Sequence, residues 1–161
     1  MLFRSCFIGN NVTIGKDCLI HANVVIYDHT VIGDRVVIHS GSILGADAFY
    51  YKKRPEGYDP LKSSGRVVIE DDVHIGAACT IDKGVSGDTT LKKGAKIDNQ
   101  VHVGHDTIIG RDCLIASQVG VAGCVVIEDG VTIWGQAGIT SAITIGSGSI
   151  ISAQSGVSKS L

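Results

Sequence analysis

The stretch from Ile97 to Ile127, IDNQVHVGHDTIIGRDCLIASQVGVAGCVVI, decides the fold of this chain. A branched aliphatic residue recurs in it every six residues, and a small or β-branched residue stands two places before each recurrence. Because six is an even number, both residues of such a pair point to the same side of a strand, whereas a helix of 3.6 residues per turn would scatter them. The period therefore predicts very short strands separated by regular corners.

The same pattern extends in both directions through most of the chain. The preceding branched residues are Ile8, Ile14, Ile20, Ile26, Ile32, Ile38, Leu44, Ile69, Ile75, Ile81 and Leu91, and the following ones are Ile133, Ile139, Ile145, Ile151 and Val157. The intervening residues are rich in Gly, Asn and Asp, which tolerate the left-handed backbone of a tight corner. Together these features predict an all-β protein built as a parallel β-solenoid, with an ordinary β-sandwich as the weaker alternative.

Composition narrows the class of protein further. The net charge of −2 argues against a nucleic-acid-binding surface, and no apolar run approaches the roughly 20 residues of a membrane span. Four of the five cysteines occupy small, core-facing positions of the repeat, so we interpret them as buried apolar residues and not as disulfides or metal ligands. Such free thiols fit a reducing compartment, and we expect a cytoplasmic protein. These four are Cys6, Cys18, Cys79 and Cys113.

We expect a single solenoid domain over residues 6–161. Residues 1–5 fit no repeat unit and are interpreted as a leader that is not native, while the repeat is still running at Val157. Because solenoids need capping ends, these features favour a fragment of a longer protein.

Two insertions interrupt the repeat, at residues 45–66 and 82–90. If each insertion replaces one corner, Leu44, Ile81 and Val103 fall on one edge of a triangular prism, and His105 follows Val103 on that edge. Loops that interrupt a rigid scaffold commonly carry function. The count therefore predicts a groove walled by two loops beside His105.

The histidines suggest acid–base chemistry more than metal binding. His21 and His39 are 18 residues apart and are expected to stack, while His102 and His105 lack the four-residue separation of the ligand pair in hexapeptide-repeat carbonic anhydrases. We therefore predict no metal site. A histidine near neutral pKa can act as a general base, and His105 has Asp98 and Asp106 as candidate orienting carboxylates.

A backbone N–H group would complete this chemistry. Gly123 lies one coil from His105 by the count, and its N–H could face a developing oxyanion. The alternative for His105 is a solvated turn residue.

Several motifs resemble those of the UDP-3-O-acylglucosamine N-acyltransferases, a branch of the hexapeptide-repeat family. They are Gly45-Ala46-Asp47-Ala48-Phe49-Tyr50-Tyr51, Gly65-Arg66-Val67-Val68-Ile69, Thr80-Ile81-Asp82-Lys83-Gly84, Ile97-Asp98-Asn99-Gln100, Gly104-His105 and Val121-Ala122-Gly123. The resemblance covers residues 8–157. It implies a left-handed parallel β-helix, a handedness that the period alone does not show.

The resemblance also implies an activity. Enzymes of this branch transfer a 3-hydroxyacyl group from acyl carrier protein to the 2-amine of a UDP-linked, 3-O-acylated glucosamine in lipid A biosynthesis, without a cofactor. Carried over to this chain, the catalytic residues are His105 as base, Asp98, and Gly123 as oxyanion contact. The resemblance further implies a homotrimer with active sites between subunits. Substrate contacts are assigned to Asn99, Gln100, His102, Asp47, Phe49 and Tyr50, with the acyl chain near the last two.

This chain also departs from the family. We expect no counterpart of the family's N-terminal uridine-binding domain or C-terminal helices within these 161 residues, and Ala142 and Ala48 replace a second histidine and a loop glycine. Three alternatives therefore stay open. They are the sister O-acyltransferase that acts on UDP-N-acetylglucosamine, a sugar-nucleotide acetyltransferase using acetyl-CoA, and a non-catalytic solenoid that serves in assembly. The acyl-chain length is not set by these residues.

Overall fold

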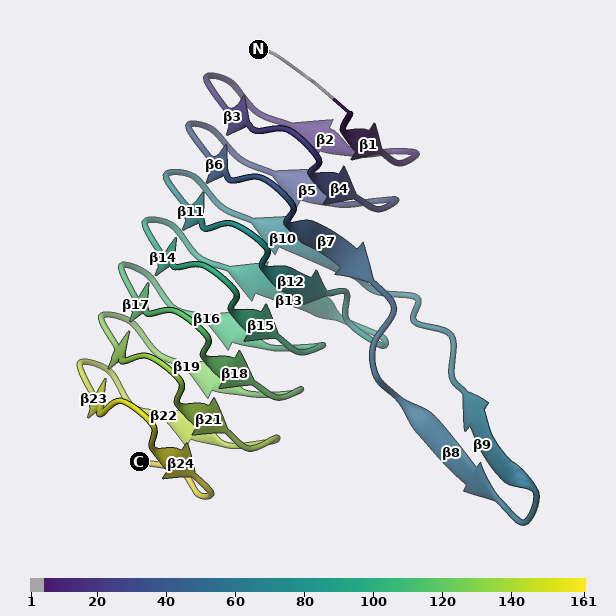
Figure 1. Ribbon diagram of the computed structural model, residues 1–161, viewed down its shortest axis with the longest axis vertical. Helices are drawn as coiled ribbons and strands as arrows, with labels where there is room; N and C mark the ends of the chain where they lie inside the picture. The colour runs from purple at the N-terminus through teal and green to yellow at the C-terminus, as the bar shows by residue number, and fades with distance from the viewer. Residues whose placement is uncertain (1–4) are drawn as a thin grey trace.

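The computed structural model describes residues 5–161 as a left-handed parallel β-helix with three faces (Figure 1). The predicted fold class is thus confirmed. The residues interpreted as a leader lie largely outside the described part of the chain. No helix occurs in the described range, so none there could cross a membrane.

Each face is one parallel sheet, and successive strands of the chain pass from the first face to the second and then to the third. The first face holds β1 (Phe7–Ile8), β4 (Val25–Ile26), β7 (Ile43–Ala46), β12 (Thr80–Asp82), β15 (His102–Val103), β18 (Gly120–Val121), β21 (Gly138–Ile139) and β24 (Gly156–Val157). The second holds β2 (Thr13–Ile14), β5 (Val31–Ile32), β10 (Arg66–Ile69), β13 (Asp88–Leu91), β16 (Ile108–Ile109), β19 (Val126–Ile127) and β22 (Thr144–Ile145). The third holds β3 (Leu19–Ile20), β6 (Val37–Ile38), β11 (His74–Ile75), β14 (Lys96–Ile97), β17 (Leu114–Ile115), β20 (Thr132–Ile133) and β23 (Ile150–Ile151).

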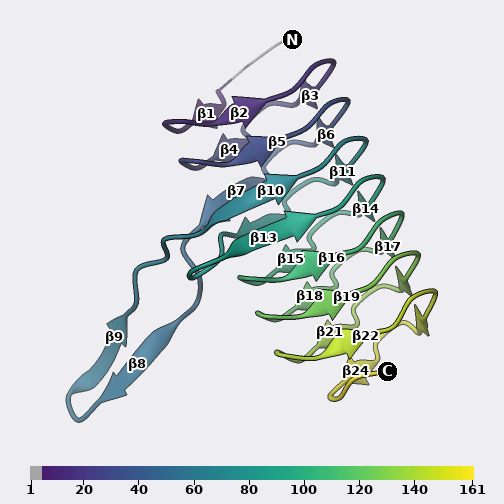
Figure 2. The same ribbon diagram turned by 180° about the vertical axis from the view of Figure 1, so that it is seen from behind.

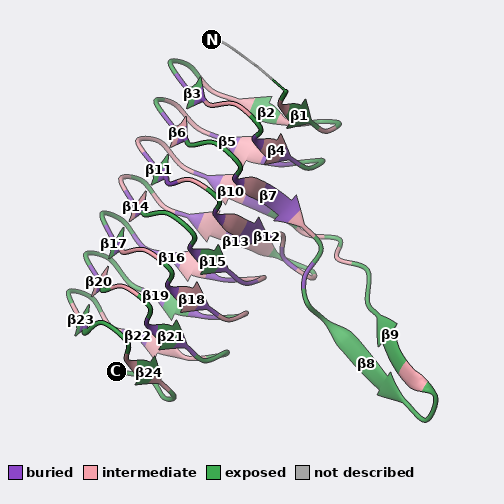
Figure 3. Ribbon diagram, viewed as in Figure 1, coloured by how far each residue is buried: buried purple, intermediate pink, exposed green. Residues whose placement is uncertain are grey.

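The branched residues of the repeat form the interior of the prism. On the first face Ile26 lies in register with Leu44, Leu44 with Ile81 and Ile81 with Val103, and all four side chains are fully buried. Burying a side chain of this size contributes about 1.5–3 kcal/mol relative to exposure. The alternation of buried and exposed residues along the coils is visible in Figure 3.

The corners adopt the left-handed backbone that we expected of Gly, Asn and Asp. The residue with positive φ lies three places after a strand and is mostly Asn, Asp, Gln or another non-glycine residue, such as Asn11 and Asp106, and sometimes glycine, such as Gly41. The glycine directly after a strand has a different use, in close packing. A Cβ at Gly104, for example, would lie 2.7 Å from the carbonyl carbon of Ala122 in the next coil.

Two further sequence predictions agree with the structure. The rings of His21 and His39 stack with centroids 4.7 Å apart and planes 9° from parallel. Cys18, Cys79 and Cys113 are buried free thiols, and Cys6 is partly buried. The Sγ atom of Cys79 lies 3.0 Å from the carbonyl oxygen of Asp98, which satisfies the thiol within the wall of the helix.

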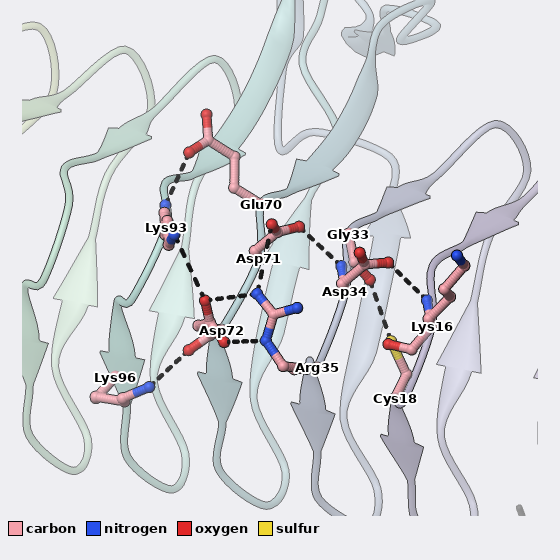
Figure 4. A network of polar contacts seen from close by, with 10 residues as sticks. All are labelled: Lys16, Cys18, Gly33, Asp34, Arg35, Glu70, Asp71, Asp72, Lys93 and Lys96. Atoms are coloured by element: carbon pink, nitrogen blue, oxygen red, sulfur yellow. Dashed lines mark hydrogen bonds and ion pairs between the residues drawn. The ribbon is translucent and has the colours of Figure 1, made fainter.

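A ladder of charged residues stabilises the second corner, where the chain passes from the second face to the third (Figure 4). The guanidinium of Arg35 donates two hydrogen bonds to the carboxylate of Asp72, at 2.6 and 2.9 Å. The pKa of Asp72 is lowered, and these hydrogen bonds are the largest cause. The amino group of Lys96 donates to the Asp72 carbonyl at 2.6 Å, so three successive coils are linked on the outside.

Both insertions leave the prism at the first corner, where the chain passes from the first face to the second. The first forms a hairpin of β8 (Tyr51–Arg54) and β9 (Gly57–Pro60) that projects away from the coils (Figures 1 and 2). The segment that returns from β9 to the prism packs on the second insertion, with the N–H of Ser64 donating to the carbonyl of Val85 at 2.9 Å. Leu44, Ile81 and Val103 share this edge, as the repeat count predicted.

Candidate active site

A groove of about 820 Å³ runs along the first corner beside the base of the hairpin. Phe49 and Tyr50 wall one side, and the coils that follow β12, β15, β18 and β21 form the rest of it. The lining is dominated by small and apolar residues, with few ionisable groups. Those coil residues are Asp82, His102, Gly104, His105, Gly120, Val121, Ala122, Gly123, Cys124, Gly138, Ile139, Thr140, Ser141 and Ala142.

His105 is the best-oriented ionisable group of the groove. It lies at the corner directly after β15, and its side chain is 15% exposed. Its Nδ1 atom lies 2.9 Å from Oδ2 of Asp106, and the Tyr50 ring meets the imidazole edge to face at 5.7 Å between centroids. Because an ionised carboxylate can only accept, this hydrogen bond places a proton on Nδ1, so that Nε2 carries the lone pair whenever the imidazole is neutral.

The second insertion holds Asp106 in place. Its carboxylate accepts the backbone N–H groups of Val85, at 2.9 Å, and Gly87, at 3.1 Å. Burial alone would raise the pKa of Asp106, but the hydrogen bonds from Val85, His105 and Gly87 together lower it. Asp106 is therefore ionised at neutral pH and fixes the ring of His105 in one orientation.

Gly123 forms the floor beneath the imidazole. It lies one coil from His105, because β15 and β18 pair with His102 opposite Gly120. A Cβ at Gly123 would lie 2.5 Å from Nε2 of His105, so only glycine leaves room for the ring.

The N–H of Gly123 lacks the side-chain acceptor that several of its counterparts at other corners have. The equivalent N–H groups of Asn10, Lys16 and Arg111 donate to aspartate side chains of the neighbouring coil. No acceptor among residues 5–161 takes the Gly123 N–H. This donor is therefore available to a ligand in the groove, beside the imidazole of His105.

The predicted residues around Asp98 lie elsewhere. Asp98, Asn99 and Gln100 are exposed at the third corner, where the chain passes from the third face to the first. Asp98 accepts the N–H of Asn99 at 2.7 Å, and Asn99 accepts that of Ala77 at 2.7 Å. Within one chain they do not join His105, and the carboxylate that orients His105 is Asp106.

A ladder of glutamine amides continues this third corner. Gln118 donates to Gln100 at 2.8 Å, Gln136 to Gln118 at 2.7 Å, and Gln154 to Gln136 at 2.9 Å. The Oε1 atom of Gln100 is therefore already engaged along the prism. Its role in this chain alone is to bind coil to coil.

The structure places three of the remaining predicted substrate residues, His102, Phe49 and Tyr50, in the groove lining and Asp47 outside it. His102 is in the lining, with Nδ1 2.8 Å from the hydroxyl of Thr80. Phe49 is 84% exposed, and Asp47 forms an ion pair with Lys83 at 2.6 Å beside the same loop. Five of the predicted site residues thus line one groove, namely His105, Gly123, His102, Phe49 and Tyr50.

Sequence reasoning missed two groove residues, Asp82 and Cys124. Asp82 is 8% exposed and occupies a position that small residues fill in the next coils, a contrast that the repeat itself could have revealed. Cys124 is exposed, and its Sγ lies within 4.8 Å of ligand atoms of His105 and Asp106. Among the described residues, this cluster is the one candidate that could hold a metal ion.

The coils of this chain match two protein-family models of hexapeptide repeats. The bacterial transferase hexapeptide model (six repeats) matches residues 11–46 and 88–123, and the model for the hexapeptide repeat of succinyl-transferase matches residues 66–104. Together they match more than half of the chain.

Curated relatives share a shorter stretch. UDP-3-O-acylglucosamine N-acyltransferase of Helicobacter hepaticus is 56% identical over 66 residues, which are 40% of this chain and 20% of that protein. The Rhizobium rhizogenes enzyme of the same name is 48% identical over 65 residues, covering 40% of this chain and 18% of that protein. The match thus spans about a fifth of these relatives.

A solved structure matches almost the whole chain. UDP-N-acetylglucosamine acyltransferase of Francisella novicida superposes with a TM-score of 0.85 at 29% identity, over 95% of this chain and 54% of that one. Similarity in sequence and similarity in structure therefore point to two related acyltransferases whose names differ in their acceptor sugar.

Proposed function

Since the chain belongs to the hexapeptide-repeat transferases, we propose that it is an N-acyltransferase acting on the 2-amine of UDP-3-O-acylglucosamine in lipid A biosynthesis. The donor in this proposal is a 3-hydroxyacyl thioester of acyl carrier protein, which places the reaction in the cytoplasm. The observation that carries the proposal is the imidazole of His105, oriented by Asp106 above the unpaired N–H of Gly123.

In this proposal the acyl group passes directly from donor to acceptor, without a covalent enzyme intermediate. The lone pair of the acceptor nitrogen attacks the thioester carbonyl carbon, and the carbonyl electrons move onto its oxygen. The N–H of Gly123 donates to this oxyanion, while Nε2 of His105 takes a proton from the nitrogen. The carbon–sulfur bond then breaks, and the thiolate takes the proton from His105. In this scheme the reaction needs no cofactor.

The groove offers a place for the acyl chain. Phe49, Tyr50, Tyr51 and Tyr58 enclose a second, aromatic hollow of about 510 Å³ beside the groove. Contact between apolar surface of this kind and an alkyl chain removes both from water, which favours binding of the chain. We place the acyl chain between the aromatic side of the hairpin and the small residues of the coils.

A homotrimer would bring the third corner of one copy to the first corner of another. This part of the proposal is supported by the position of Asp98, which is exposed and separate from the groove of its own chain.

The shared site is tested with two variants, His105→Ala and Asp98→Asn. The two kinds of chain are unfolded, mixed and refolded together. We expect activity above that of either parent, because some interfaces then pair intact residues. No recovery would contradict a shared site.

The second candidate is an O-acyltransferase that acts on UDP-N-acetylglucosamine. The similarity to the Francisella novicida structure favours it, and the His105–Asp106 pair would serve a hydroxyl acceptor equally well. The two functions differ in the acceptor nucleophile, which is an amine in one case and a hydroxyl in the other.

The decisive experiment measures acyl transfer with two donors and two acceptors. We expect product from a 3-hydroxyacyl carrier protein and UDP-3-O-acylglucosamine, and none from acetyl-CoA. Product from UDP-N-acetylglucosamine instead would establish the second candidate, and preference for acetyl-CoA would indicate an acetyltransferase. Absence of turnover with every pair would reject catalysis and favour an assembly module.

A further inference from the structure

Asp82 is a buried carboxylate that the proposed reaction does not use. It ends β12, is 8% exposed, and lines the groove that contains His105. Among residues 5–161, no backbone or side-chain group donates a hydrogen bond to its carboxylate. The Nε2 atom of His102 lies 3.8 Å from Oδ2 of Asp82, beyond hydrogen-bond distance, and the two side chains carry opposite charges only when the imidazole is protonated.

This arrangement is unfavourable unless a ligand completes it. Burial raises the pKa of Asp82, the neighbouring His102 and His105 act in the opposite direction, and Asp47 adds to the increase. A buried carboxylate without donors costs free energy, and buried polar groups in proteins are almost always hydrogen-bonded. Asp106 at the same corner shows the usual solution, because Val85, Gly87 and His105 all donate to it.

The missing donor has to come from the groove. No fully enclosed side-chain oxygen among the described residues lacks a partner, so the Asp82 oxygens keep their access through the groove. Strand β12 pairs with β15, which places Asp82 next to Gly104, and the following coils carry Ala122 and Thr140 at the same position. These small residues leave the carboxylate uncovered on the side where His105 lies.

We propose that Asp82 binds the acceptor amine and selects an amine over a hydroxyl. This inference rests on the proposed acyl transfer and names the residue that decides its acceptor. An ammonium group brings a positive charge and three N–H donors, which suit a buried carboxylate with no donor of its own. A neutral hydroxyl offers one donor and no charge, so it compensates the same carboxylate less well.

The protons balance along this route. The acceptor binds as an ammonium ion and then loses its first proton to water in the groove, which frees the nitrogen lone pair. The second proton leaves for His105 during the attack and ends on the thiol. Asp82 is therefore a binding and specificity residue, while His105 remains the base.

The test compares UDP-3-O-acylglucosamine with its 2-hydroxy counterpart, UDP-3-O-acylglucose, on the full chain. We expect wild-type protein to bind the amine about 10- to 100-fold more tightly in titration calorimetry without donor, in line with a charge-assisted hydrogen bond. In Asp82→Asn this preference should shrink to less than about threefold, with the loss appearing in binding of the amine only. Asp129→Asn removes an exposed carboxylate at the second corner and should keep the full preference.

The outcomes separate this inference from the proposed function. Equal binding of both sugars by wild-type protein, or an unchanged preference in a folded Asp82→Asn variant, would overturn the role of Asp82. If Asp82→Asn does not fold, the wild-type comparison alone decides. Failure of the proposed function would show differently, as absence of acyl transfer to either sugar by wild-type protein.

Discussion

The imidazole of His105 rests directly on the α-carbon of Gly123, one coil further along the prism. A Cβ at residue 123 would lie 2.5 Å from Nε2, so the two residues have to be considered together. Glycine here provides space for the base and leaves an N–H next to it. The base and the oxyanion donor of the proposed reaction thus depend on one backbone position.

Replacing Gly123 with Ala should therefore remove most activity without unfolding the chain. The added methyl group displaces the imidazole from its contact with Asp106, and we expect a loss in kcat of at least about 100-fold, the scale of losing one oxyanion donor. Steady-state kinetics and thermal melting check this. Gly156→Ala is the matched control, because a Cβ there meets no atom within 4 Å and the residue lies outside the groove. Equal kinetics of the two variants would contradict the packing of His105 on Gly123.

Replacing His105 with Ala should abolish acyl transfer. The side chain is the base of the proposed reaction, and general-base catalysis contributes about 10²- to 10⁴-fold. His39→Ala is the control, since that ring only stacks on His21. Circular dichroism should show an intact fold for both variants. A folded His105→Ala variant with full activity would contradict the role of His105 as the base.

Replacing Asp106 with Asn should lower both activity and stability. Asp106 accepts three hydrogen bonds, and its pKa lies below the ordinary value, so its ionised form stabilises the fold above the pKa of the unfolded chain, about 4. That contribution disappears as the pH falls through the lower folded pKa. The difference in Tm between wild type and variant should thus be largest above about pH 5 and should shrink as the pH falls below about 4. A constant difference across this range would refute the linkage.

Tyr50 provides a test of the hairpin's part in the site. Its ring contacts the imidazole edge to face, so Tyr50→Ala should expose the groove and reduce kcat/KM about 10-fold, the upper end of an aromatic pair's contribution. Tyr50→Phe keeps the ring and should retain activity. A loss in Tyr50→Phe equal to that in Tyr50→Ala would assign the role to the hydroxyl.

The interior of the prism makes a separate prediction about stability. Leu44 is fully buried between Ile26 and Ile81, and Leu44→Ala should lower the free energy of unfolding by about 2–5 kcal/mol through the cavity it leaves. Leu114→Ala is the matched control, because that leucine faces outward and is 43% exposed. Chemical denaturation measures both, and a similar loss in both variants would contradict the inward position of Leu44.

The sequence by itself determined the scaffold and the edge on which the site lies. A six-residue period repeats one local geometry, so the position of His105 above the second insertion follows from counting. The handedness came from the family resemblance. The pairing of Asp106 with His105 was one of two possibilities, and Asp82 was not recognised as a groove residue.

Only the tertiary structure decided between such possibilities. Asp98 and Asp106 are both close to His105 in sequence, yet one lies at the third corner and the other accepts N–H groups from an insertion about 20 residues earlier. Similarly, the burial of Asp82 depends on coils that come before and after it. The period fixes which residues face inward, because side-chain direction is a local property of a strand. Which outward side chains meet is set by the loops, whose paths the period does not encode.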